Sequence, residues 1–391
     1  MEKPRVVWLL THRIQYFTNL LEELHQRGNV DVKAIYAHET ANFQDKGFGR
    51  KISWDNRHET SFPEYVLPDS AERPHGPLLN SRSRYLDTAL HEFDPHVVHL
   101  NGYTTAIQLQ GWGWAIRHRV PYLIRCDGDN IGKKTGWKST IRRQLVRPVT
   151  GNASTVMYQG RQNREFWESN GAKDHQLIWV PCVSDSQVFR VTAFDTEASR
   201  QRFRADMGAA THETVFVMSG KLEPRKRPAD AIHALARIAD LPIKLWFLGS
   251  GQLEGELKAL SQQLGVDDRV TWLGFRNQSK IPAILQAADV LLHASQMDPW
   301  PYAILDGAIS GTALLLSDRT GSYPDWMADP PAGLVFECGN VEHLAQCMTT
   351  MATDSAQRRS YRDAAKARAA DYTESTFCNI FEQAVFECLR V

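Results

Sequence analysis

The sequence predicts an α/β protein built from two doubly wound, Rossmann-like domains. Apolar runs of strand length alternate with amphipathic segments of helix length through most of the 391 residues. The strand-like runs are almost continuously apolar, as in parallel sheets that are covered on both faces. The alternation stops after Val180 and restarts near Val215, which indicates two domains of similar size.

In the first half, polar connections separate clear elements. We expect strands at 6–11, 32–37, 97–100, 122–126, 155–158 and 177–180, with helices at 15–27, 84–93, 105–118 and 161–170. Residues 39–79 form a long polar stretch rich in Gly, Pro and aromatic residues. A stretch of that length is typically a functional loop or an insertion.

The second half repeats the pattern after a polar linker near 183–212. We expect strands at 215–219, 243–248, 270–273, 290–293, 313–316 and 334–336, and helices at 228–239, 253–264, 281–287, 302–310, 341–351, 355–370 and 374–389. The expected domains are 1–185 and 186–373, with a C-terminal helix at 374–391 that packs back on the first. A ligand is expected in the cleft between them, at the carboxyl ends of the strands.

Charge and composition exclude several classes of protein. With 45 Lys+Arg against 45 Asp+Glu, the chain lacks the positive excess of a nucleic-acid binder. The charge is uneven, because residues 1–190 hold 25 basic and 20 acidic side chains. No apolar run approaches the roughly 18 residues of a membrane helix, and the start shows no signal-peptide pattern. Six cysteines without any CxxC indicate neither a disulfide framework nor a zinc site. We expect a cytoplasmic protein.

A basic turn follows the first strand of the second half. Gly220 ends the strand, Lys221, Arg225, Lys226 and Arg227 follow, and Pro228 opens a helix. Backbone N–H groups and a helix N-terminus make such turns suitable for anions, and lysines can bind a diphosphate. A solvated basic turn is the alternative.

A second turn contains Gly249 and Gly251 between a strand and a helix. The third glycine of a dinucleotide fingerprint is missing, because residue 254 is Glu. The pair therefore predicts a tight turn and no nicotinamide cofactor.

Two carboxylates lie eight residues apart around the start of the helix at 302–310. Asp298 lies in the loop before the helix, and Asp306 lies inside it. This spacing allows one carboxylate to accept from sugar hydroxyls and the other from a ribose, with the helix N-terminus between them. In the alternative, Asp298 caps the helix and Asp306 is a solvated helix residue.

The ordered series GKLxxxxK, GSG, VTWLGF, D-x7-D, GTA and GLVF resembles glycosyltransferase family 4, across most of residues 180–345. That family has the GT-B fold, a retaining mechanism and an E-x7-E motif. The resemblance implies that Lys221 and Lys226 bind the donor diphosphate, that Asp298 binds the donor sugar, and that Asp306 binds the ribose. The other donor-binding positions that it implies are Gly220, Gly249, Gly251, Phe275, Trp300, Pro301 and Tyr302.

The chain departs from the family's pattern in two ways. Both acidic positions are Asp where the family usually has Glu, which shortens their reach by one methylene. Pro301 stands where the family typically has Gly, and it has no N–H for a phosphate.

The first half resembles a subgroup of the same family that has a QYF segment after the first strand and a later GFG…WD stretch. These motifs and the HLNGY segment imply acceptor-side roles for Gln15, Tyr16, Trp54, Asp55, His99 and Asn101.

Asp127 ends another strand at the same edge and is the third candidate catalytic residue with Lys226 and Asp298. Its carboxylate could accept the acceptor's proton or orient the acceptor. The alternatives are a pair with Arg125 or a plain loop position. Asp127-Gly128-Asp129 imitates a DxD metal motif, but the family resemblance supplies cations from lysines, so we expect no metal and no cofactor.

Residues 130–164 contain no acidic side chain and many Lys and Arg, interleaved with apolar residues. Such a segment can lie on an anionic membrane, which predicts a peripheral contact at the inner face. A solvated basic face or an anionic-acceptor site is the alternative.

The function that these features predict is retaining transfer of a sugar from a nucleoside diphosphate sugar to a hydroxyl of a glycan, a lipid-linked or a small-molecule acceptor. A sugar-nucleotide epimerase of the same fold and a non-catalytic sugar-nucleotide-binding descendant are the alternatives.

Overall fold

The computed structural model of the chain describes residues 2–39, 44–45, 50–51, 60–69, 81–131, 144 and 146–390. These residues fall into two compact units. The first contains the described residues up to 39, from 60 to 183 and from 372 onward. The second contains residues 184–371 and the short strands β3 (Gln44–Asp45) and β4 (Arg50–Lys51).

In its described part, the first unit is a seven-stranded parallel sheet in the order β5-β2-β1-β6-β7-β8-β9. Its elements are β1 (Arg5–Leu10), α1 (Gln15–Arg27), β2 (Asp31–Tyr36), β5 (Glu64–Val66), α2 (Leu86–Phe93), β6 (Val97–Asn101), α3 (Ala106–His118), β7 (Tyr122–Arg125), β8 (Thr155–Tyr158), α5 (Arg161–Ser169), η2 (Asp174–Gln176), β9 (Leu177–Trp179) and α15 (Glu374–Cys388).

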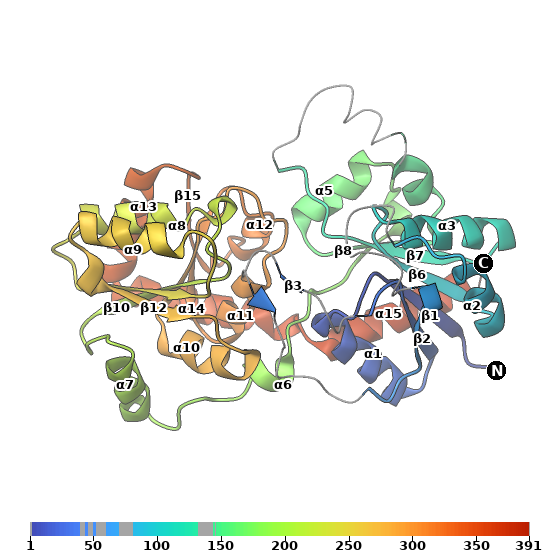
Figure 1. Cartoon of the computed structure of the whole chain (residues 1–391), viewed down its shortest axis with the longest axis horizontal. Coiled ribbons are helices and arrows are strands. Elements are labelled where there is room, and N and C mark those ends of the chain that lie inside the picture. The colour runs from blue at the N-terminus through green and yellow to red at the C-terminus, as the bar shows by residue number, and fades with distance from the viewer. Residues whose placement is uncertain are drawn as a thin grey trace. The chain divides into compact units, whose positions relative to one another are not determined.

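Helices cover both faces of this sheet. One apolar cluster joins strand residues such as Trp8 to α1 and to Phe377 and Phe381 of α15. The opposite cluster joins the other side of the same strands to α2, α3 and α5. The last helix of the chain therefore belongs to the core of the first unit (Figure 1).

The described second unit is a six-stranded parallel sheet in the order β12-β11-β10-β13-β14-β15. Its elements are α6 (Ser186–Phe189), α7 (Glu197–Asp206), β10 (Thr214–Ser219), η3 (Pro224–Lys226), α8 (Pro228–Arg237), β11 (Ile243–Leu248), α9 (Glu254–Gln263), η4 (Asp267–Arg269), β12 (Val270–Gly274), η5 (Gln278–Lys280), α10 (Ile281–Ala287), β13 (Val290–His293), α11 (Tyr302–Ile309), β14 (Ala313–Ser317), α12 (Tyr323–Trp326), β15 (Gly333–Phe336), α13 (Val341–Thr353), α14 (Ser355–Arg368) and η6 (Ala369–Asp371).

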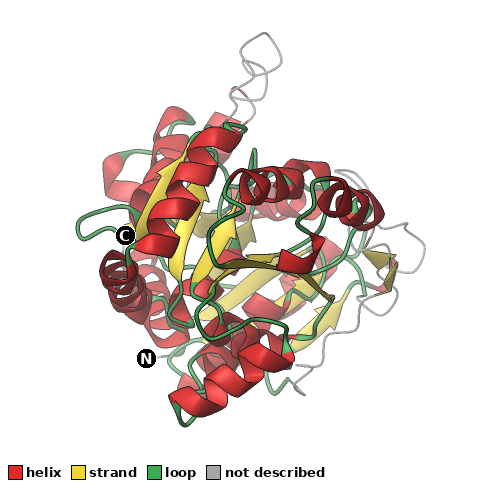
Figure 2. Ribbon diagram, turned by 90° about the vertical axis from the view of Figure 1, so that its left-hand side faces the viewer, coloured by secondary structure: helices red, strands yellow, loops and turns green. Residues whose placement is uncertain are grey.

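This sheet too lies between two layers of helices. Figure 1 shows α8, α9 and α13 on one side of the strands and α10, α11 and α14 on the other. Figure 2, turned by 90°, shows strands enclosed by helices. The predicted fold class, two Rossmann-like domains, is confirmed.

Local sequence explains where several helices begin and end. Gly28 adopts a left-handed conformation and closes α1 through its N–H to Leu24 O. The side chains of Asn340 and Thr373 accept from backbone N–H groups at the starts of α13 and α15. These caps satisfy backbone groups that the helices themselves leave unpaired.

The structure corrects the prediction at two places. Strand β5 lies inside the stretch expected to be one long loop, where it adds an edge strand beside β2. Helix α7 lies inside the segment expected to be a polar linker. It has no apolar stripe, and side chains hold it instead: Thr196 caps it, and Arg200 and Arg204 bind Asp289.

Asp289 is the buried anchor of α7. Its carboxylate lies 2.9 Å from Arg204 Nη1 and 3.0 Å from Arg200 Nη2, and it accepts the Val215 N–H at 2.8 Å. Burial alone would raise the pKa of this carboxyl. Arg204, the Val215 N–H and Arg200 lower it by more, so the pKa lies below its usual value. The group is therefore ionised in the folded chain.

We expect Asp289→Ala to lower the free energy of unfolding by roughly 3–5 kcal/mol, since it leaves the buried Arg204 without its counter-ion. Urea unfolding followed by circular dichroism measures the change. Asp206→Ala, which removes an exposed carboxylate at the end of the same helix, is the matched control and should be near neutral. Equal midpoints for the two variants would contradict this role of Asp289.

Candidate functional site

The loops at the carboxyl ends of β10 and β11 lie backbone against backbone. The Gly220 N–H donates to Leu248 O at 2.9 Å, and the Leu222 N–H donates to Ser250 O at 3.0 Å. Gly249 has φ +146°, and a Cβ there would lie 1.9 Å from Gly220 O. The turn predicted from the two glycines is thus a close packing of two loops, which a side chain at position 249 would disrupt.

The basic turn is bound to the loop that follows β13. The Gln296 N–H donates to Arg225 O at 2.9 Å, and the Ser295 hydroxyl donates to the same oxygen at 3.2 Å. In return, Arg225 Nη1 donates to Met297 O at 3.0 Å. These three bonds hold Lys226 next to Asp298.

Lys226 and Asp298 form a direct ion pair, in which Nζ donates to Oδ2. Asp298 is only 8% exposed. His293, the last residue of β13, places Nε2 3.2 Å from the same oxygen, at ion-pair distance but out of line for a hydrogen bond. Two residues predicted from distant motifs therefore meet at one point of the second unit.

The protonation states at this point follow from burial and charge. Burial alone would raise the pKa of Asp298, but His293 and Lys226 hold it well below its usual range. Burial lowers the pKa of His293, only partly offset by Asp298, so the imidazole is neutral near pH 7. Asp298 is thus an ionised acceptor beside a cation.

The loop after β14 fixes the backbone of Asp298. The Gly321 N–H donates to Asp298 O at 2.8 Å, and the Asp298 N–H donates to Arg319 O at 3.4 Å. The cap of α11 is Pro301, without a side-chain cap bond. Asp298 therefore does not act as a helix cap, which was the alternative role.

Asp306 lies one turn into α11, where the Ser184 hydroxyl donates to Oδ1. Burial and the neighbouring Asp185 raise the pKa of its carboxyl to about 7, although Ser184 opposes the change. In the described residues, no hydrogen bond or ion pair joins Asp306 to the Lys226–Asp298 pair. Its surroundings are not those of a solvated helix residue.

The remaining predicted donor positions follow strands of the same sheet. Gly251 packs against the Leu222 backbone, where a Cβ would lie 2.4 Å from the carbonyl oxygen. Phe275 directly follows β12, Trp300 is buried before α11, and Tyr302 begins that helix. Lys221 is partly exposed in the basic turn.

In the first unit, Asp127 follows β7 and is exposed. Gln159 Nε2 donates to its Oδ1 at 2.7 Å. The Asn163 amide donates to Gly128 O at 2.6 Å and Cys126 O at 3.0 Å, which holds the loop after the strand. The carboxylate is thus oriented by Gln159.

The acceptor-side role predicted for His99 does not fit its position, because the side chain lies in the core. It is 0% exposed, and its ring packs against Trp8 with centroids 4.0 Å apart and against Phe381 at 5.5 Å. Burial and the charge of Arg125 lower its pKa to about 3, so it is neutral. The side chain has no exposed surface that could touch a substrate.

The other acceptor-side positions are less fully described. Asn101 ends β6 and Tyr16 lies in the first turn of α1, both partly exposed. Gln15 is the first residue of α1. Trp54 and Asp55 lie outside the described residues, as does most of the basic window 130–164.

Two features are absent from the described residues. They contain no group of three or more His, Cys, Asp or Glu able to hold a metal ion. They also contain no helix that is long and apolar enough to cross a membrane.

Sequence reasoning missed the residues that support the site. His293 could have been found, because it is the polar end of a buried strand at the carboxyl edge of the sheet. Ser184, Gln159 and the carbonyl of Arg225 had no local signal, since each acts on a partner more than 30 positions away.

Two models of known protein families together match most of the chain. The family model described as "Glycosyl transferases group 1" matches residues 199–368, and the one described as "Glycosyl transferase 4-like domain" matches residues 14–182.

Among curated proteins, the N-acetylgalactosamine-N,N'-diacetylbacillosaminyl-diphospho-undecaprenol 4-alpha-N-acetylgalactosaminyltransferase of Campylobacter jejuni is 28% identical over 239 residues, 60% of this chain and 61% of that protein. The lipopolysaccharide core biosynthesis glycosyltransferase LpsE of Rhizobium meliloti is 29% identical over 156 residues, 40% of this chain and 44% of LpsE. The chain thus matches less than two thirds of the length of these relatives.

Among solved structures, HepE of Anabaena in complex with UDP matches with a TM-score of 0.73 and 16% identity, over 99% of each chain. WaaG, a glycosyltransferase involved in lipopolysaccharide biosynthesis, matches with a TM-score of 0.67 and 16% identity, over 97% of this chain and 99% of WaaG. At these identities the likeness concerns the fold.

We expect Gly249→Ala to destabilise the second unit, because the new Cβ would collide with the Gly220 carbonyl and because a positive φ of +146° is strained for alanine. Thermal unfolding should show a lower midpoint. The control is Gly255→Ala, since Gly255 lies in α9 with no atom within 4 Å of its Cβ position. Alanine there should be neutral or stabilising. A Gly249→Ala protein as stable as the Gly255→Ala protein would refute the close packing.

We expect Asp306 to make stability depend on pH. Its folded pKa of about 7 lies above the unfolded value of about 4, so the native state binds the proton more tightly. The contribution of Asp306 to the free energy of unfolding is therefore complete below about pH 4 and declines as the pH rises to about 7.

Asp306→Asn removes this dependence. The free energy of unfolding of the Asp306→Asn protein, minus that of the original chain, should rise as the pH goes from about 4 to about 7. Urea titrations at several pH values measure this difference. A constant difference from pH 4 to pH 8 would argue against the raised pKa.

Proposed function

Since the chain belongs to the family-4 glycosyltransferases of GT-B architecture, we propose that it transfers a sugar, with retention, from a nucleoside diphosphate sugar to an acceptor hydroxyl. The observation that carries the proposal is the ion pair of Lys226 with the buried, ionised Asp298 beside the basic turn. The pair offers a cation for a diphosphate and an acceptor for sugar hydroxyls within one hydrogen-bond length of each other.

Donor binding would divide these two charges between two groups of one ligand. Lys226 and Lys221 would contact the diphosphate, and Asp298 would accept from a sugar hydroxyl. Asp306, held by Ser184, would accept from the ribose or donate to it, because its raised pKa leaves part of the population protonated near neutral pH. The bound UDP in the HepE structure supports a uridine nucleotide as a first donor to test.

In the proposed reaction, the bond between the anomeric carbon and the diphosphate oxygen breaks, and the acceptor oxygen bonds to the same face of that carbon. The acceptor's proton passes to the departing diphosphate. Lys226 stabilises the negative charge that develops on the diphosphate, an electrostatic effect that acts mainly in the transition state. No metal or cofactor is part of this proposal. Asp127, exposed and oriented by Gln159, would orient the acceptor hydroxyl.

The acceptor class is also a proposal. The name of the Campylobacter jejuni relative describes transfer to a glycan on a diphospho-undecaprenol lipid, and LpsE is named for lipopolysaccharide core biosynthesis. Both support a glycan acceptor, lipid-linked in the first case. Contact of the basic window 130–164 with an anionic membrane would suit such an acceptor, in a cytoplasmic enzyme at the inner face.

The test is a panel of nucleoside diphosphate sugars. At least one should raise the melting temperature and be consumed faster when glycan or lipid-linked acceptors are added. Lys226→Ala should lower transfer by roughly 10²–10³-fold, the usual effect of losing one transition-state donor.

The matched control is Lys244→Ala. Lys244 lies at the amino end of β11, away from the strand ends that carry the site, and its ammonium donates to Asp268 O at 2.6 Å. Its turnover should stay within about twofold, as expected for a surface change. Nucleotide-sugar conversion that needs no acceptor, or equal rates in the two variants, would contradict the proposal.

A further inference from the structure

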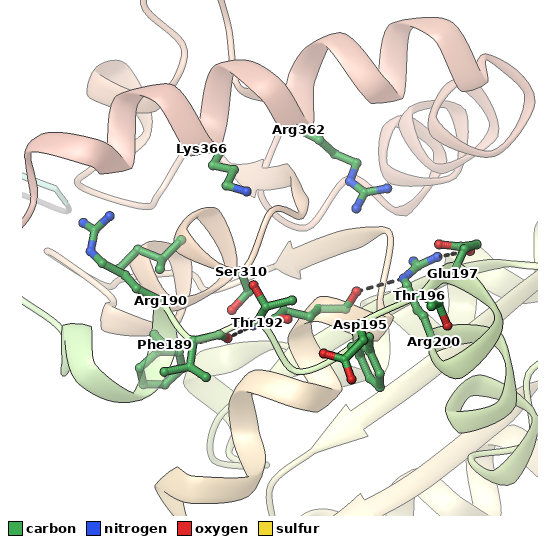
Figure 3. Close-up of a pocket in the computed structure, with 14 residues that line it drawn as sticks. Phe189, Arg190, Thr192, Asp195, Thr196, Glu197, Arg200, Ser310, Arg362 and Lys366 are labelled. Atoms are coloured by element: carbon green, nitrogen blue, oxygen red, sulfur yellow. Dashed lines mark hydrogen bonds and ion pairs between the residues drawn. The ribbon is translucent and has the colours of Figure 1, made fainter.

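The second unit holds a cavity of about 460 Å³ away from the proposed donor loops. It lies between the segment that joins α6 to α7, the C-terminal end of α11, and α14 (Figure 3). Its volume falls within the range of small-molecule sites. No residue of the Lys226–Asp298 site lines it.

The cavity carries an excess of positive charge. Its lining includes the cations Arg190, Arg200, Arg362 and Lys366, against the acids Asp195 and Glu197. Glu197 is already engaged, because its carboxylate lies 3.1 Å from Arg200 Nη1. Figure 3 shows Arg362 and Lys366 pointing from α14 toward the segment between α6 and α7.

Arg362 presents an unused part of its guanidinium. Nε donates to Gly311 O at 2.6 Å, and the described residues provide no hydrogen bond for its two terminal nitrogens. Burial lowers the pKa of Arg362, and the nearby cations Arg200 and Arg358 lower it further, against the effect of Asp289. The group stays charged, in surroundings that favour a bound anion.

Two further groups are available. Lys366 is exposed, and within the described residues its ammonium makes no hydrogen bond or ion pair. Ser310 is 9% exposed, and its buried hydroxyl has no hydrogen-bond partner there. A buried polar atom without a partner is costly, which a ligand or water in the cavity would relieve.

We propose that this cavity is a second ligand site, for a small molecule that carries a phosphate group. The free edge of the Arg362 guanidinium matches two phosphate oxygens, Lys366 adds a point charge, and Ser310 adds a hydroxyl. Phe189, Phe194 and Ile309 give the cavity an apolar side for an organic body. The site does not depend on the proposed glycosyl transfer.

The cavity also touches an element of the proposed donor site. Ser310 directly follows α11, the helix that carries Asp306, and Phe189 ends the short helix that begins two residues after Ser184. A ligand here would therefore contact both chain segments that the Ser184–Asp306 hydrogen bond joins.

Calorimetric titration tests the site with two probes, inorganic phosphate and glucose 6-phosphate. Both are added to the Lys226→Ala protein, so that phosphate binding at the basic turn of the donor loops is weakened. We expect saturable binding, weakened about tenfold or more by Lys366→Gln and by Arg362→Gln, as for a lost charged hydrogen bond.

Arg359→Gln is the matched control, since it removes the same charge from an exposed position on α14 outside the cavity. It should leave affinity within about twofold. Lys366→Gln keeps the test decisive if Arg362→Gln fails to fold, because Lys366 is exposed and its ammonium makes no hydrogen bond or ion pair within the described residues. Tighter binding of glucose 6-phosphate would identify an organic phosphate, and equal binding would identify free phosphate.

The position of the ligand can be read directly. Bound probe should slow acylation of Lys366 by an amine-reactive reagent, followed by peptide mass spectrometry, and leave the exposed Lys280 unaffected. The proposal is overturned if neither probe saturates, or if Lys366→Gln and Arg359→Gln bind alike.

Discussion

The ion pair between Lys226 and Asp298 joins two loops that follow neighbouring strands, β10 and β13. Each loop alone would expose a charge to water, where surface pairs contribute little. Together they bury the carboxylate and keep it ionised, since the cation offsets the cost of desolvation. The bonds that Arg225 makes to the second loop, and the hold of Gly321 on the Asp298 backbone, keep this geometry.

This ion pair also explains how an aspartate fits at a position where family-4 glycosyltransferases usually have a glutamate. The shorter side chain lies against Lys226 and beside His293, so its position is set by neighbours rather than by reach. Pro301 caps α11 without a backbone donor, so in the proposed donor site the anion would be bound by lysine ammonium groups and the remaining N–H groups.

Much of the fold could be predicted because parallel sheets covered on both faces leave a strong apolar periodicity. The helix at residues 281–287 and the strand at residues 155–158 coincide with α10 and β8. Helix α7 could not be predicted in this way, because ion pairs of Arg200 and Arg204 with the buried Asp289 stabilise it instead of an apolar stripe. The period of a pattern does not reveal ion pairs between residues far apart in sequence.

The candidate site shows the same division. Glycine turns and charged residues after strands pointed to Lys226 and Asp298, because strand ends meet at one edge of a sheet. The environment of Asp306 depends on Ser184, and that of His99 on α15, and neither contact has a local signal. Residue type and spacing indicate which groups take part, whereas burial and protonation depend on the tertiary fold.

The position of α15 has a consequence for the order in which the chain acquires structure. During synthesis, the second unit has all its strands and helices once residue 371 has emerged, whereas the first unit still lacks Phe377, Phe381 and their neighbours. The core around Trp8 therefore remains open on one face until α15 has also left the ribosome. The half of the protein that is made first is the half that completes its folding last.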